Sequence, residues 1–155
     1  GTFGGTCLNV GCIPAKELLE TATVARTVAG AGEYGVGAQP LGLDWSVTLN
    51  RKQKIVDQLV SGLAGLLKGR KVTVFDGTGR LGADHRTVSI DGGASGAVQI
   101  TGDAVILAAG SLPRTLPNFP IDSHRIVTSD ELLSIPALPA SAVVIVHDWR
   151  AISVT

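Results

Sequence analysis

The sequence predicts an α/β fold on three observations. Apolar residues recur at helical spacing in two stretches, from Ala15 to about Ala31 and from about Trp45 to Leu67. Short alternating runs between residues 72 and 101 are separated by glycine and aspartate turns, which is typical of a small antiparallel meander. A continuous apolar run, Ala104 to Ser111, ends in a glycine turn and favours a parallel strand buried on both faces.

Composition narrows the classes of function. The chain has 155 residues, thirteen basic and thirteen acidic, and no basic stripe, so nucleic acid is a poor partner. No apolar run is long enough to span a bilayer, no signal-peptide pattern is present, and we expect a cytoplasmic location. The sequence has no methionine and starts inside a cysteine motif, so we expect an internal piece of a longer protein.

That motif, which precedes the first helix, holds both cysteines of the chain, Cys7 and Cys12, with four residues between them and glycines around them. Pro14 suits the first turn of a helix, and the positive end of a helix dipole favours a thiolate. The pair could therefore be a redox disulfide, a structural disulfide, or two buried thiols in a reducing compartment. Two cysteines without a nearby histidine cannot fill a zinc site, so we expect no metal.

Two helices follow. In the first, Leu18, Ala22, Ala25 and Ala29 recur at helical spacing, and the stripe of small residues on that face allows close approach of another backbone; Gly30 marks the end of the helix. In the second, Asp44 is the expected N-cap. The apolar residues of this second helix lie on one side and its charged residues mostly on the other, as in a surface helix.

The strands come next. Val72 to Phe75 is an expected strand, residues 76–79 an expected turn in which Gly79 takes a positive φ, and Thr87 to Ile90 with Val98 to Thr101 an expected hairpin. Ligands of parallel sheets bind beyond the carboxyl ends of the strands. Three residues at the end of the 104–111 run are therefore candidate cofactor contacts: Ala109, Gly110 and Ser111.

The last third of the chain is mostly connection. Three prolines make Leu112 to Pro120 an extended connector. Ser129 to Leu133 is an expected short helix capped by Thr128 or Ser129. Ala142 to Val146 is an expected buried strand.

The cysteine motif carries a resemblance to a known family. Its residues are Gly4, Gly5, Thr6, Cys7, Leu8, Asn9, Val10, Gly11, Cys12, Ile13, Pro14, Ala15 and Lys16. They resemble the active-site motif of the class I pyridine nucleotide-disulfide oxidoreductases, which are FAD enzymes. Leu8 and Ile13 make the motif most similar to the dihydrolipoamide dehydrogenase branch, and the resemblance runs to about Val146.

The resemblance implies a partial doubly wound FAD-binding domain with a helical pair and a small antiparallel meander, followed by the start of a second nucleotide-binding domain. Residues 1–113 would be the C-terminal part of the FAD domain with the redox disulfide. Residues 114–141 would be a connector, and residues 142–155 a truncated first strand of the NAD domain.

Residue roles follow from the same resemblance. Cys7 would exchange with the substrate and Cys12 would face the flavin, with Lys16 beside the flavin ring and Gly79 against the adenine part of FAD. The remaining expected FAD contacts are Gly5, Thr6, Ala109, Gly110 and Ser111. Ala109 stands where the family usually has threonine, so only a backbone contact is expected there.

The implied reaction passes electrons between a dihydrolipoamide-type dithiol, the cysteine pair, FAD and NAD. A homodimer and a place in a 2-oxo acid dehydrogenase complex are the implied partners. The family's first phosphate loop, its NAD loop after Val146 and its His-Glu acid/base pair have no counterpart here, and neither His85 nor His124 lies in a matching motif. We therefore expect a chain that is incomplete for turnover.

Other interpretations stay open. A truncated or degenerate non-catalytic product would explain the unusual sequence from His147 onward, where His147 and Asp148 are either a proton-transfer pair or ordinary surface residues. A glutathione reductase-like or mercuric reductase-like member would use the same motif. A small thiol-disulfide protein without flavin is a third class, although such proteins place two residues between their cysteines.

Overall fold

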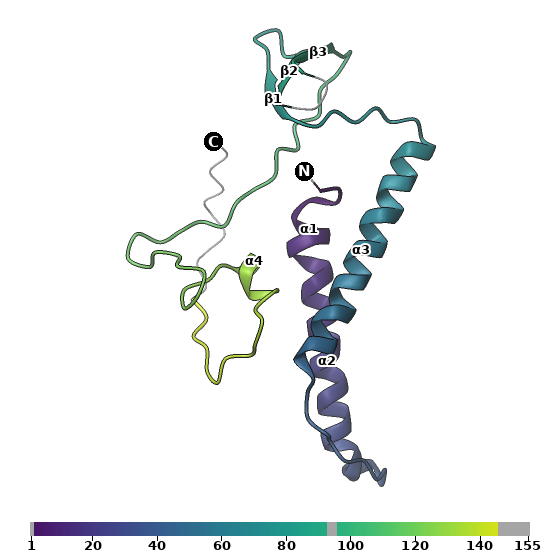
Figure 1. Cartoon of the computed structure of the whole chain (residues 1–155), viewed down its shortest axis with the longest axis vertical. Helices are drawn as coiled ribbons and strands as arrows, with labels where there is room; N and C mark the ends of the chain where they lie inside the picture. Colours follow the sequence, from purple (N-terminus) through teal and green to yellow (C-terminus); the bar gives the residue numbers. More distant parts are fainter. Residues whose placement is uncertain (1, 93–95, 146–155) are drawn as a thin grey trace.

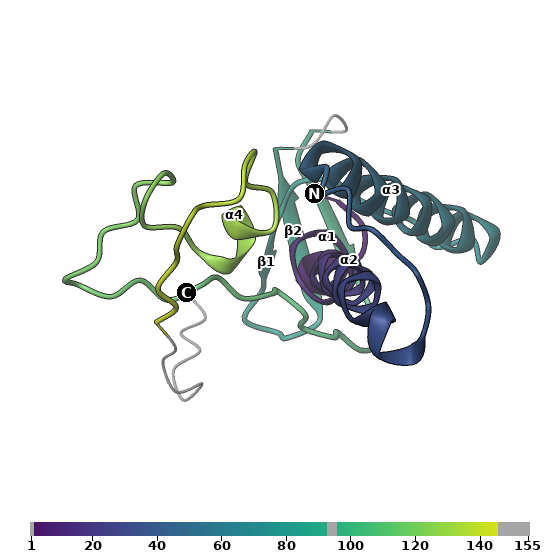
Figure 2. The ribbon, with the colours of Figure 1, turned by 90° about the horizontal axis from the view of Figure 1, so that it is seen from below.

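A computed structural model describes residues 2–92 and 96–145. Figure 1 shows three parts: a long helical pair, a small meander beyond the far end of one helix, and an irregular C-terminal third that returns beside the pair. Figure 2, seen from below, shows the meander behind the helices and the C-terminal third to one side of them. The expected helical pair and meander are both confirmed.

The first helical segment is split in two. Helix α1 runs Gly5–Val10, and α2 runs Cys12–Gly30 after an interruption at Gly11. α2 begins three residues before the expected start, so Pro14 is its third residue and is fully buried. The first four N–H groups of a helix have no intrahelical acceptor, so proline costs no hydrogen bond there. The 3₁₀ turn η1, Ala31–Tyr34, closes the helix.

Helix α3, Trp45–Gly69, packs against α2. The carboxylate of Asp44 accepts a hydrogen bond from the Val47 N–H at 3.1 Å, which confirms the expected N-cap. Val56 is 4% exposed, and an ion pair joins Arg51 to Glu17 of α2. Both apolar burial and a cross-helix charge pair therefore hold the helices together.

The stripe of small residues on α2 faces an apolar groove of about 470 Å³. The groove lies between α2 and the irregular C-terminal third, and its lining includes Ala22, Leu43, Trp45, Leu133 and Leu138.

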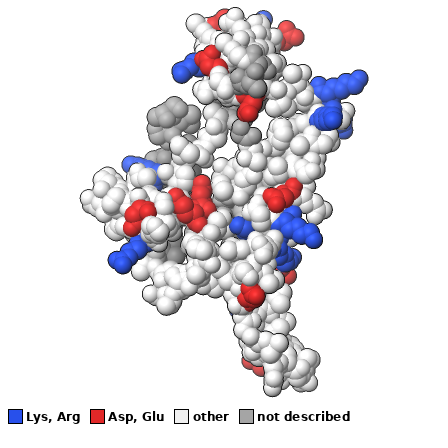
Figure 3. Space-filling model, in the orientation of Figure 1, with Lys and Arg blue, Asp and Glu red and all other residues white. Residues whose placement is uncertain are grey.

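On the face that Figure 3 shows, charges of both signs are interspersed among uncharged surface.

The meander consists of β1 (Thr78–Leu81), β2 (Thr87–Asp91) and β3 (Val98–Thr101), paired antiparallel in that order. β2 and β3 confirm the expected hairpin.

The expected strand at residues 72–75 and the turn role of Gly79 are wrong. Residues 72–75 form no strand, and β1 begins only at Thr78. Gly77, with a φ of +147°, is the residue that needs to be glycine, because an added Cβ would lie 2.5 Å from the Asp91 carbonyl oxygen. Gly79 instead sits within β1, opposite the buried Ile90.

The expected strand at residues 104–111 is also absent, and residues 142–145 form no strand. Ile106 is 92% exposed and Leu107 is 75% exposed. A strand needs a neighbour to accept and donate its backbone hydrogen bonds, and none of the described strands pairs with these segments. The apolar pattern indicates that these segments favour burial, but it does not show whether a neighbouring strand is present to pair with them. Val146, the His147–Asp148 pair and the residues after them lie outside the described residues.

Helix α4, Ser129–Leu132, is the regular element of the C-terminal third. Thr128 and Glu131 form a capping box, which confirms the expected cap. Among the described helices, none is both long and apolar enough to cross a membrane.

Two side chains of α3 hold the end of α4. The Trp45 indole donates to the Ile135 carbonyl at 2.9 Å. The Lys52 ammonium donates to the Leu133 carbonyl at 2.9 Å and to the Ser134 hydroxyl at 3.2 Å. Lys52 is only 5% exposed, and burial lowers the pKa of its ammonium. These hydrogen bonds therefore fasten residues 133–135 of the irregular third to the helical pair.

Candidate functional site

The two cysteines lie on either side of the helix interruption. Cys7 belongs to α1, Cys12 is the first residue of α2, and both are exposed free thiols. A helix of nineteen residues therefore begins at one thiol, and its positive end favours negative charge on sulfur there. The expected placement of the pair at the mouth of a helix is met.

Glycine makes this arrangement possible. At Gly11, an added Cβ would lie 2.8 Å from the carbonyl oxygen of Thr6 and 3.1 Å from the Cα of Cys7. At Gly4, φ is +97° and an added Cβ would collide with the Leu8 side chain. Only glycine at both positions lets the chain fold this tightly around Cys7.

Cys12 changes the ionisation of Cys7. A hydrogen bond between the Cys7 and Cys12 side chains is the largest of the causes that raise the pKa of Cys7, followed by desolvation and by the charge of Cys12. The Cys12 backbone N–H and the positive charge of Lys16 lower the same pKa. The net effect is a raised pKa for Cys7, with Cys12 as its main cause.

This interaction predicts a change in pH dependence. In Cys12→Ala the hydrogen bond and the charge that raise the pKa of Cys7 are gone, so Cys7 should ionise at a lower pH. The rate of Cys7 alkylation by iodoacetamide, followed by peptide mass spectrometry across pH, should show a lower midpoint than in the wild-type protein. Lys16→Met should move the midpoint the other way. Identical profiles for wild type and Cys12→Ala would contradict the thiol–thiol contact.

The structure brings some of the expected cofactor residues together. Gly5 and Thr6 lie in α1 beside Cys7, and Lys16 lies one turn into α2 after Cys12; all three are exposed. Gly79 lies in β1, and residues 109–111 lie in the extended segment that leaves the meander. These last residues are on separate elements, so the cysteine pair is the centre of the site.

The residues around the pair suit a large, electron-accepting ring system. At Gly5, φ is +56° and no atom lies within 4 Å of an added Cβ, so the surface there is open. Lys16 and the start of α2 both bring positive charge beside the thiols, which favours a ring that becomes electron-rich on reduction. The residues present therefore fit a flavin.

Sequence reasoning missed the role of three motif residues. Gly4 and Gly11 are needed for close approach, and the Asn9 side-chain amide bonds to two backbone carbonyls of the same loop. The glycines on both sides of the cysteine pair were the sequence signal that could have indicated this close approach. The distances that make them necessary appear only when the loop is folded.

The chain belongs to the pyridine nucleotide-disulphide oxidoreductase family, whose profile matches residues 2–146. Among its relatives, a dihydrolipoyl dehydrogenase of Bacillus subtilis is 39% identical over 147 residues, which is 94% of this chain and 32% of that protein. A dihydrolipoyl dehydrogenase of Vibrio cholerae is 38% identical over 143 residues, which is 92% of this chain and 30% of that protein.

The fold has a counterpart among solved structures. The crystal structure of LpdA from Mycobacterium tuberculosis matches with a TM-score of 0.77 and 22% identity, over 89% of this chain and 30% of that one. The fold is thus that of part of this class of oxidoreductase, consistent with a partial FAD-binding domain. The chain spans about a third of the length of the curated relatives it matches.

Proposed function

We propose that the chain carries the redox centre of a flavin-dependent disulfide oxidoreductase that acts on a dihydrolipoamide-type dithiol. The observation that supports this most is the close approach of Gly11 to the backbone of Cys7, which brings the two cysteines together at the start of α2. The names of the relatives favour the lipoamide-type substrate over glutathione disulfide or mercuric ion.

The chemistry of the pair is thiol–disulfide exchange. In the oxidised pair, a substrate thiolate attacks the Cys7 sulfur, the Cys7–Cys12 bond breaks, and Cys12 leaves as a thiolate. The second substrate thiolate then attacks the substrate sulfur bound to Cys7, which closes the substrate disulfide and releases Cys7. Two electrons pass from the substrate to the cysteines, and the two substrate protons are left with the Cys7–Cys12 dithiol and solvent.

The surrounding residues favour this exchange. Lys16 lowers the pKa of Cys7 and so stabilises the thiolate that is released in the second step. The start of α2 stabilises the Cys12 thiolate released in the first step. Because Cys7 lies in α1 and not in α2, it can accept the substrate while Cys12 stays at the end of the longer helix.

FAD and NAD complete the proposal. When bound, FAD would supply a two-electron acceptor for the reduced pair, with NAD as the final acceptor. Gly5, Thr6 and Lys16 would hold the flavin near the pair, and Gly79 with residues 109–111 would hold the remainder of FAD. In this proposal residues 1–113 serve the FAD domain, 114–141 connect, and 142–155 begin the NAD domain of a cytoplasmic homodimer in a 2-oxo acid dehydrogenase complex.

Steady-state turnover tests the function. The longer protein of which this chain is expected to be a piece should, when supplied with FAD, oxidise NADH with lipoamide, and Cys7→Ser or Cys12→Ser in it should lower kcat by about a thousandfold or more, since each removes one reacting sulfur. Lys54→Ala, on the exposed side of α3, is the matched control and should keep the wild-type rate. Equal rates in the serine variants would refute the role of the pair, and turnover with glutathione disulfide or mercuric ion alone would change the substrate class.

A further inference from the structure

Asn9 lies between the two cysteines, and no step of the exchange uses it. Its Nδ2 donates hydrogen bonds to the carbonyl oxygens of Phe3 and Gly5, both at 2.9 Å. Both partners are acceptors, so only the nitrogen of the amide satisfies them. One side chain thus ties Phe3, before α1, and Gly5, the first residue of α1, to the far end of that helix.

The loop that Asn9 ties down has little else to fix it. Gly4 and Gly5 both have positive φ values, +97° and +56°, a conformation that glycine leaves readily. No side chain caps α1, which has only six residues and is too short to be stable by itself. Its Leu8 N–H reaches the Gly4 carbonyl at 3.4 Å, a long hydrogen bond. The position of Cys7 therefore depends on contacts from outside the α1 backbone.

Cys12 is fixed from the other side. It begins α2, whose Ala15 N–H bonds to the Gly11 carbonyl at 3.0 Å and whose Pro14 is buried. The Cys12 sulfur thus belongs to the long helix α2, whereas the Cys7 sulfur belongs to the short helix α1, which the Asn9 side chain holds in place. Closure of a disulfide depends on how much of the time the two sulfurs are within bonding reach.

We propose that Asn9 is a positioning residue that sets the effective concentration of the Cys7 thiol toward Cys12, and thereby the reduction potential of the pair. The inference rests on the proposed function, because it concerns the same two sulfurs. Loss of the clamp frees Cys7 to leave Cys12, which makes the disulfide less favourable and easier to reduce.

The test is the equilibrium of the pair with glutathione. Purified protein is equilibrated in buffers of defined reduced-to-oxidised glutathione ratio, quenched with acid, alkylated, and the Cys7–Cys12 disulfide is counted by mass spectrometry. Asn9→Ala should lower the equilibrium constant for disulfide closure about tenfold, because two hydrogen bonds are lost, and a tenfold change is about 30 mV for a two-electron couple. Asn9→Asp, which keeps the shape but has no donor, should change it in the same direction.

Controls separate this role from a structural one. Asn50→Ala, at an exposed position of α3, should leave the equilibrium unchanged. If both Asn9 variants lower the thermal midpoint yet keep the wild-type equilibrium, or if neither folds, the positioning role is overturned. If the wild-type protein forms no Cys7–Cys12 disulfide in any buffer, the proposed function fails. If it does form and the variants match it, only the role of Asn9 fails.

Discussion

Gly11→Ala should prevent Cys7 and Cys12 from reaching each other and so nearly abolish exchange with oxidised lipoamide. The new Cβ would lie 2.8 Å from the Thr6 carbonyl oxygen, so the backbone on one side must move. Overpacking against backbone costs about 1–3 kcal/mol, and a displacement on the scale of 1 Å slows a positioned reaction about a hundredfold. The loss of the protein's own thiols, followed by rapid acid quench, alkylation and mass spectrometry after reduced protein is mixed with oxidised lipoamide, measures the effect.

The matched control is Gly62→Ala in the middle of α3. No atom lies within 4 Å of an added Cβ there, so the substitution should leave exchange unchanged and stabilise the helix by about 0.5–1 kcal/mol. Wild-type exchange rates in Gly11→Ala would show that close approach at Gly11 does not hold the thiols together.

Lys52→Ala should release residues 128–135 from the helical pair. The substitution removes the two hydrogen bonds that the Lys52 ammonium donates to Leu133 and Ser134. It leaves the Leu133 carbonyl without that donor, at a cost of about 1–3 kcal/mol. Exchange of the Leu132 and Leu133 amides, which bond within the α4 turn, should then be about ten- to a hundredfold faster.

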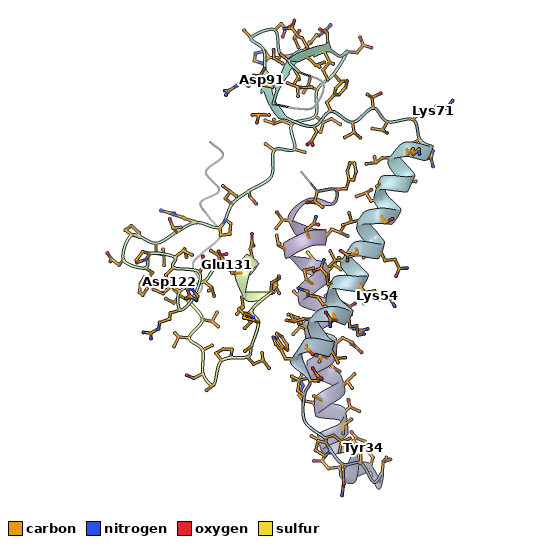
Figure 4. The ribbon with its side chains drawn as sticks, viewed as in Figure 1. Tyr34, Lys54, Lys71, Asp91, Asp122 and Glu131 are labelled. Carbon is orange, nitrogen blue, oxygen red and sulfur yellow. The ribbon has the colours of Figure 1, made fainter. Side chains whose placement is uncertain are left out.

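Hydrogen exchange read by mass spectrometry on peptides from this region measures the release. Lys54→Ala removes a lysine two residues further along α3 that is exposed, and Figure 4 shows it on the outer side of the helix. It should leave exchange in residues 128–135 unchanged. Unchanged exchange in Lys52→Ala, with α3 still helical, would mean that the segment is held by other contacts.

Local signals made the helices and turns predictable from sequence. Asp44, Thr128 and Gly35 mark helix ends through side-chain caps and a left-handed backbone, which neighbouring residues determine. The hairpin of β2 and β3 was predictable because its strands are close in sequence.

Non-local contacts explain the failures. The run at 104–111 has a strand's composition, but a parallel strand exists only beside another strand. Gly77 and Gly79 lie two residues apart in the same turn-like stretch, so the sequence does not show which of them must be glycine. The pairing of β1 with β2 shows that it is Gly77, which lies against the Asp91 carbonyl.

At the candidate site, too, some features were predictable from the sequence and others were not. The spacing of Cys7 and Cys12 predicted that they could meet at a helix start, since a few residues of backbone limit how far apart they can be. The need for glycine at Gly11 and the clamp by Asn9 depend on interatomic distances in the folded loop. Spacing alone also left a redox disulfide, a structural disulfide and two buried thiols open, and only exchange chemistry identifies a redox pair.

The most direct measurement is a thiol count before and after reduced protein is mixed with an excess of oxidised lipoamide. The redox-pair account predicts that two thiols of the protein fall to none, with a mass loss of about 2 Da from two lost hydrogen atoms and a peptide that links Cys7 to Cys12. Two thiols that persist under these conditions, or disulfides that form only between separate chains, would contradict it.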